Sequence, residues 1–147
     1  MSFRLSSIYK SLTRHLMDTI EDVKSAGIAT PAYYAWDSHG DDTEIDAVDL
    51  MGLAGWTFEE NGGLWKIHVG ITVSTINDQN LFREIDIIDA IHDRWGEGAI
   101  VPMLDPDTGD EYTQLVVNHF EMLPAGNSEK RNYRPIGLEL LRTSNDG

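Results

Sequence analysis

The chain has 147 residues, a length that fits one domain, because two cores would leave each half too small. Eleven basic and 25 acidic residues give a formal net charge of −14, which disfavours DNA and anionic membranes as partners, since both attract clustered lysine and arginine. Without cysteine, disulfides, thiolate metal sites and thiol nucleophiles are excluded. We therefore expect a single soluble domain over residues 1–147 with no membrane-spanning segment.

The first predicted element is an amphipathic helix over residues 5–23, where apolar residues recur at spacings of three and four. Ser6 or Ser7 can cap its start, because a hydroxyl accepts a hydrogen bond from an unpaired amide of the first turn. Gly27 can end it, since glycine adopts the left-handed conformation of a helix C-terminus without a steric penalty.

A strand is predicted over residues 28–36, and Pro31 places its early part at a sheet edge or a bend. The polar stretch that follows is predicted to be a loop that carries five potential ligands for a hard cation. Their spacing matches no EF-hand loop or zinc motif, so we expect a solvated acidic loop, no metal and no cofactor. The five residues are Asp37, His39, Asp41, Asp42 and Glu44.

Residues 56–75 have the pattern of a β-hairpin whose turn is Asn61-Gly62-Gly63. In the second arm apolar residues alternate with polar or small ones, so one face of this strand is expected in the core and the other in solvent. His68 falls on the solvent side and could meet His119 across the sheet. The apolar set is Trp65, Ile67, Val69, Ile71 and Val73.

A second helix is predicted over residues 81–95 and is expected to close at Gly96. On this helix His92 with Asp89 or Asp93 could form an acid–base pair, although structural histidines are far commoner. The sequence holds no nucleophile elbow, phosphate loop or dinucleotide fingerprint, so we do not expect an enzyme. The stripe expected to face the core contains Leu81, Ile85, Ile88, Ile91 and Trp95.

Three strands are predicted after the second helix, over residues 100–104, 112–123 and 133–142. The dense apolar run Leu115-Val116-Val117 suggests that the middle strand is buried on both faces. Strands grouped apart from helices are typical of α+β proteins. We expect an α+β fold with a mixed, largely antiparallel sheet and two helices packed on one face.

A candidate interface is suggested by charged and aromatic residues beside predicted loops. Lys130, Arg131 and Arg134 surround Tyr133 and hold three of the eleven basic residues, so they could dock an acidic surface, including another copy of the chain. Aromatic residues near loops are typical interface anchors, and the acidic loop offers the opposite charge. The candidate residues are Trp56, Phe58, Lys130, Arg131, Tyr133, Arg134, Asp41 and Asp42.

The order of elements resembles the tail terminator proteins of long-tailed bacteriophages. The residues that carry the resemblance are the opening helix Ile8–Val23, the hairpin arm Trp65-Lys66-Ile67-His68-Val69-Gly70-Ile71-Thr72-Val73, the helix Leu81–Trp95 and the closing strand Ile136-Gly137-Leu138-Glu139-Leu140-Leu141. The resemblance implies a ring, with six copies, that caps the tail tube protein and joins it to the neck or connector protein of the head. In a contractile tail it also implies contact with the sheath. Such a protein is assembled in the host cytoplasm and resides in the virion.

Three other readings of the sequence remain open. A phage head-completion or baseplate protein is the nearest alternative. A small acidic binding module would be monomeric and would seek a basic partner. A metal-dependent hydrolase that uses the loop at residues 37–44 is the least favoured, because it lacks a recognised ligand spacing.

Overall fold

The structure is a computed structural model that describes residues 5–27, 32–35, 46–51, 57–61, 64–76, 81–128 and 131–143. Within these ranges the chain forms two helices and eight strands. The helices are α1 (Leu5–Ser25) and α2 (Leu81–Trp95). The strands are β1 (Ala32–Ala35), β2 (Ala47–Met51), β3 (Thr57–Asn61), β4 (Leu64–Ile76), β5 (Ile100–Leu104), β6 (Glu111–Met122), β7 (Gly126–Asn127) and β8 (Arg131–Thr143).

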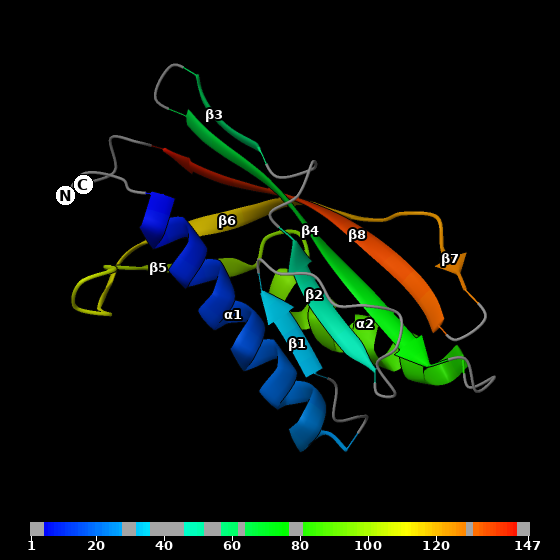
Figure 1. The fold of residues 1–147 in the computed structure, drawn as a ribbon. Helices are drawn as coiled ribbons and strands as arrows, with labels where there is room; N and C mark the ends of the chain where they lie inside the picture. The colour runs from blue at the N-terminus through cyan, green and yellow to red at the C-terminus, as the bar shows by residue number, and fades with distance from the viewer. Residues whose placement is uncertain are drawn as a thin grey trace.

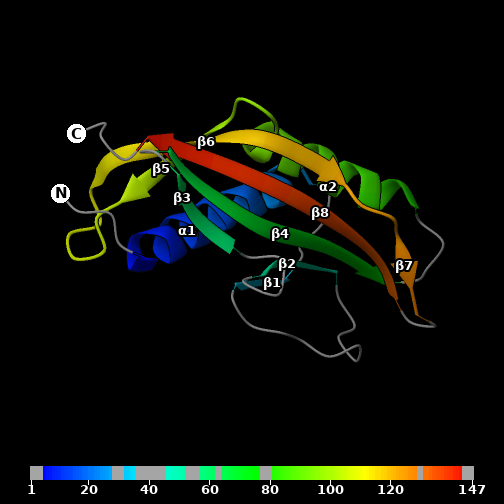
Figure 2. The same ribbon diagram turned by 90° about the horizontal axis from the view of Figure 1, so that it is seen from above.

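All described strands belong to one curled sheet with the order β1-β2-β4-β8-β6-β5, to which β3 adds on β4 and β7 adds on β8 (Figure 1). Only β1 and β2 run parallel among the described pairs. The sheet curls around α1 and α2, which lie on the same side of it (Figure 2). The expected α+β fold with a largely antiparallel sheet is thus confirmed.

The core lies between the helices and one face of the sheet. Ile67, Val69 and Ile71 of β4 are buried on this face, as the alternation predicts. Their cross-strand partners in β8 are equally buried, because directly opposite residues share a face: Leu140, Leu138 and Ile136. The helices close the core with Ile8, Leu12, Leu16, Ile87, Ile91 and Trp95.

Helix α1 also shields the outer edge of strand β5. The Ser11 hydroxyl accepts a hydrogen bond from the Leu104 amide at 2.8 Å, and the Ser7 hydroxyl donates to the Leu104 carbonyl at 2.7 Å. Ser7 is therefore inside α1 and binds the sheet, so its expected role as a helix cap is wrong. Gly27 does follow the helix with φ of 71°, as expected for its C-terminus.

Helix α2 has the predicted bounds, but the expected core stripe is wrong at one position. Ile85 is 51% exposed, whereas Ile87 is fully buried. Glu84 takes the inward position two turns before Ile91, where it accepts a hydrogen bond from the Arg134 guanidinium at 3.2 Å. An ion pair at the end of the core thus replaces the apolar contact that periodicity predicted.

Helix α2 ends directly before Gly96, as predicted, and the turn after it contains two glycines. Gly96 does not have a positive φ; a Cβ there would lie 2.6 Å from the His92 carbonyl oxygen, so close backbone approach requires glycine. Gly98 has φ of 87°, and its amide donates to the Val117 carbonyl.

Neither helix combines the length and apolar character of a membrane-spanning segment, within the described part of the chain.

Two strand predictions also need correction. Residues 47–51 form β2, where the sequence patterns predict no strand, and Asp46 just before it binds the Arg83 guanidinium. In β6, Leu115 and Val117 are buried but Val116 is 38% exposed, so the strand is buried on one face only. Simple alternation therefore holds in this part of β6.

Substitutions on α2 test the observed orientation of its core face. We expect Ile87→Ala to lower the free energy of unfolding by about 2–5 kcal/mol, because it leaves a cavity among buried side chains. Ile85→Ala, two positions earlier on the same helix, should change it by less than about 0.5 kcal/mol. Urea denaturation measures both, and a larger loss for Ile85→Ala would contradict the helix orientation.

Candidate functional site

A groove of about 330 Å³ lies on the face of the sheet turned away from the helices. It crosses β4, β8 and β6, the three strands at the centre of the curled sheet. Its lining includes two histidines, two glutamates and two glycines: His68, His119, Glu121, Glu139, Gly70 and Gly137. Titratable side chains and a hollow therefore coincide on that face.

Strand register builds the groove as rows of residues that cross the sheet. In the first row His68 of β4 and His119 of β6 each lie opposite Glu139 of β8, from its two sides. In the next row Gly70 and Glu121 lie opposite Gly137. Because partners across a ladder share a face, both rows face outward.

A β-bulge brings His119 into this row. Val117 is buried on the core side, so strict alternation would turn His119 to the core side as well. The register shifts between Val117 and His119, and Asn118 is the extra residue. The sequence pattern predicts that His68 faces outward and could meet His119 across the sheet. Glu139, which lies between the two histidines, was not predicted.

Each carboxylate of the groove already has a polar neighbour in the chain. The Asn118 amide donates to Glu139 Oε1 at 2.7 Å, and His68 Nε2 lies 3.7 Å from Glu139 Oε2. His119 Nε2 lies 3.4 Å from Glu121 Oε2, while its Nδ1 lies 3.6 Å from Glu97. The glutamates thus offer acceptor atoms at an accessible surface, with side-chain exposures of 22% for Glu139 and 59% for Glu121.

The histidines of the groove contact carboxylates: His68 lies near Glu139, and His119 lies near Glu97 and Glu121. The described residues include no group of three or more histidine and carboxylate side chains that could hold a metal ion. What the groove presents is a pair of carboxylates beside bare backbone.

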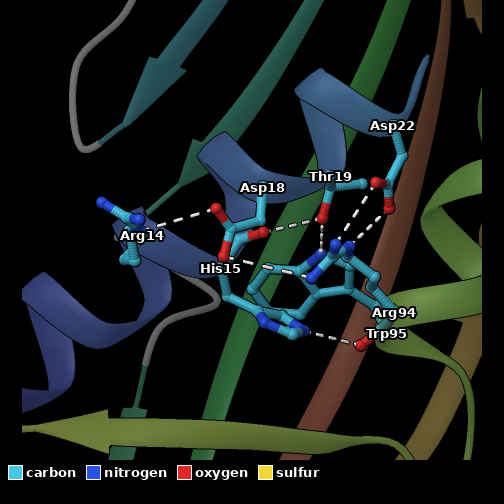
Figure 3. Close-up of polar contacts among 7 residues, drawn as sticks. All are labelled: Arg14, His15, Asp18, Thr19, Asp22, Arg94 and Trp95. Carbon is cyan, nitrogen blue, oxygen red and sulfur yellow. Dashed lines mark hydrogen bonds and ion pairs between the residues drawn. The ribbon is translucent and has the colours of Figure 1, made fainter. Parts of the chain in front are cut away.

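A second polar cluster joins α1 to α2 (Figure 3). The Arg94 guanidinium binds Asp22 through two nitrogens, with Nη2 at 3.2 Å from Oδ1. Trp95 donates to the Thr19 hydroxyl at 2.9 Å, and Thr19 in turn donates to the His15 carbonyl at 2.8 Å. The cluster ties two helices that are remote in sequence.

His15 is the buried member of this cluster. Its Nε2 lies 2.7 Å from the Arg94 carbonyl oxygen, which can only accept, so Nε2 carries the proton. The ring meets Trp95 edge-on at 4.7 Å. Burial lowers the pKa of His15, with the backbone hydrogen bond and the carboxylates of Asp18 and Asp22 opposing that shift.

Arg94 lowers the pKa of Asp22 through their hydrogen bonds. Because the two side chains are 36% and 44% exposed, the pair contributes at most about 1 kcal/mol. His92, proposed from the sequence as part of an acid–base pair, instead packs edge-on against Phe120 at 4.9 Å. The α1–α2 cluster therefore holds the two helices together.

The expected basic patch does not form from its described arginines. Arg131 is fully buried and donates to Ser74 through Nε and Nη2. Arg134 donates to Glu84 and, at 3.1 Å, to the Leu123 carbonyl. Arg134 lies opposite Val73 in the strand register, so strand alternation places its side chain on the core side.

The other candidate interface residues stay as predictions. Tyr133 is half-buried in β8 opposite Ser74. Phe58 has its backbone in β3 opposite Ile67. The remaining candidates lie outside the described residues: Trp56, Lys130, Asp41 and Asp42, together with the other acidic-loop residues Asp37, His39 and Glu44. No protein-family model matches the chain, and a search of curated proteins finds no match to its sequence.

The buried His15 makes stability depend on pH in a defined direction. Its pKa in the folded chain lies below the ordinary value of 6.5, so the unfolded chain binds more protons between these values. Stability is therefore complete above about 6.5 and falls on acidification below it. We expect His15→Gln to flatten the profile of unfolding free energy between pH 7 and 5, measured by urea titration.

The matched control is His92→Gln, which replaces an exposed histidine on α2. Its unfolding free energy should depend on pH with the same slope as that of the parent protein. The Asp22–Arg94 pair acts in a separate window, because the pKa of Asp22 is lowered from 3.8 and its contribution is lost only below that pH. Equal slopes for the parent and His15→Gln would contradict the role given to His15.

Chelation tests the expectation that the acidic loop at residues 37–44 holds no metal. We expect the melting temperature to be unchanged by excess EDTA, since only a ligand bound to the folded chain raises its stability. The control is the same titration with added Ca²⁺ or Zn²⁺. A fall of several degrees with EDTA that either metal reverses would support the hydrolase alternative.

Proposed function

We propose that this protein is a non-enzymatic structural subunit that forms a ring, with six copies, on the end of a phage tail tube and joins it to the neck. The observation that carries the proposal is the arm formed by β3 and β4. Strand β4 pairs with β2 over Gly70–Ser74 and with β3 over Leu64–His68. The β3–β4 hairpin therefore extends along β4 beyond the part that pairs with β2 (Figure 1). Such an arm can reach a neighbouring subunit.

The β5 edge and the β3 edge of the sheet differ in a way that supports directional assembly. At the β5 edge, α1 hydroxyls satisfy both backbone groups of Leu104, and Pro102 has no amide to offer. At the arm, β3 pairs with β4 alone among the described strands. An open strand edge is a template for pairing with another chain. A subunit with a shielded β5 edge and an available β3 edge favours the head-to-tail contacts of a closed ring.

The charge of the chain supports the phage setting. A ring through which DNA passes must not hold phosphate, and a net charge of −14 opposes such binding. The partners of the ring would be the tail tube protein, the neck or connector protein and, in a contractile tail, the sheath. This setting rests on the resemblance to tail terminators, and a head-completion or baseplate role would use the same arm.

Electron microscopy of assembled tails tests the proposal. We expect the protein as a ring of six at the head-proximal end of the tube. Phe58→Lys should abolish the ring, because a charge within the β3 edge opposes strand pairing. Gln114→Lys, on an exposed position of β6, is the control and should leave the ring intact.

Circular dichroism of both variants separates loss of assembly from loss of folding. If a folded Phe58→Lys variant still forms the ring, the arm is not part of the subunit interface. Absence of the protein from virions, or its presence as a single copy, would refute the ring itself. In that case a monomer that binds a basic partner would favour the acidic binding module.

A further inference from the structure

Gly70 and Gly137 lie directly opposite each other in the middle of β4 and β8, although the fold does not require glycine at either position. Neither has a positive φ. A Cβ on Gly70 would lie 3.7 Å from the Ile136 carbonyl oxygen, and one on Gly137 would lie 3.8 Å from Leu123 Cδ1. Both are ordinary van der Waals distances, so alanine would fit.

Glycine inside a strand weakens it, because it loses more backbone entropy on folding and adds no side chain to the sheet. The chain therefore gives up stability at two adjacent positions without an internal steric reason. Such glycines often mark a place where a ligand or another chain approaches the backbone closely. Here the pair forms the floor of the groove of about 330 Å³.

The walls of the groove indicate what approaches. Glu139 and Glu121 border the glycine floor on the β8 and β6 sides, and both side chains are accessible. The chain as a whole carries a charge of −14, so the surrounding field attracts cations. Leu123 and Pro135 line the same groove and offer apolar surface to the carbon stem of a long basic side chain.

We infer that the groove binds an arginine side chain of a basic partner protein. The guanidinium lies on the bare backbone of Gly70 and Gly137 and donates to the carboxylates of Glu139 and Glu121. A planar guanidinium with five donors fits a shallow floor between two carboxylates better than the compact ammonium of lysine. A second copy of the chain is a poor occupant, because five of its described arginines already bind acceptors within their own subunit.

This inference is independent of the ring, since it uses the outer face of β4, β8 and β6 and not the β3 edge. NMR titration tests it with a short peptide of alternating glycine and arginine against ¹⁵N-labelled protein. We expect saturable shifts of the Gly70, Gly137 and Glu121 amides. A matched peptide with glutamate in place of arginine should cause none.

Two kinds of variant separate a binding role from a structural one. Gly137→Val should abolish peptide binding while the melting temperature stays equal or rises, because valine favours a strand and fills the floor. Gln114→Val, an exposed position of β6 outside the groove, should leave binding unchanged. Glu121→Gln should weaken binding about tenfold, since a charged hydrogen bond contributes about that factor, whereas Glu111→Gln should not.

Several results would overturn the inference. These are no saturable shifts with the arginine peptide, unchanged binding by Gly137→Val, or equal binding of a lysine peptide, which would show general attraction to negative charge. Shifts at the same glycines with Zn²⁺ alone would assign the groove to a metal. A dimer in sedimentation that Gly137→Val dissociates would assign it to a second copy of the chain.

Discussion

The pairing of β4 with β8 is the contact on which the rest of the structure depends. The two strands pair along all 13 residues of each, and they come from segments near the middle and the end of the chain. Their register decides which residues face the core and which face outward. A slip of β8 by one residue would turn its buried Leu140 and Ile136 to solvent and its groove residues Glu139 and Gly137 to the core side. The core and the groove are thus two consequences of one register.

The few basic residues of this acidic chain serve mainly to hold it together. Five described arginines bind acceptors inside the subunit: Arg83 binds Asp46, Arg94 binds Asp22, Arg131 binds Ser74, Arg134 binds Glu84, and Arg142 binds Thr113. Each joins segments that are distant in sequence. Arginines used in this way have their charge partly offset within the subunit, and the net charge of −14 leaves a negative field around the chain. That is the field in which a cationic partner would be recognised.

Sequence patterns predicted what depends on local periodicity and failed where tertiary contacts decide. The alternation in β4 and the bounds of α2 follow from local patterns, and both are confirmed. Glu84 faces inward because Arg134 of a distant strand meets it, a pairing that helix periodicity does not contain. Ser7 does not cap the helix as expected, because its hydroxyl donates to the Leu104 carbonyl instead. β2 is only five residues long and follows an acidic stretch of sequence, so its pairing with β4 had little local signal.

The groove was only half predictable for the same reason. Alternation places His68 outward, and applied to β8 it would also place Glu139 outward. His119 faces the same way only because a bulge adds one residue to β6, and no turn or glycine signal in Val117-Asn118-His119 announces it. The Gly70–Gly137 pair is visible only once the register is known, since 67 positions of chain separate the two residues (137 minus 70).

In the two proposals, the arm and the groove use an edge and a face of one sheet for recognition. Thr57 of β3 pairs with His68, so the arm begins where the groove begins, yet the two surfaces present different groups. The β3 edge offers backbone donors and acceptors, which suit a strand of any sequence. The groove offers carboxylates and bare backbone, which select a cationic side chain. Because β4 contributes to both, a neighbouring subunit on the arm and a basic partner on the face can be held by the same rigid strand without competing for it.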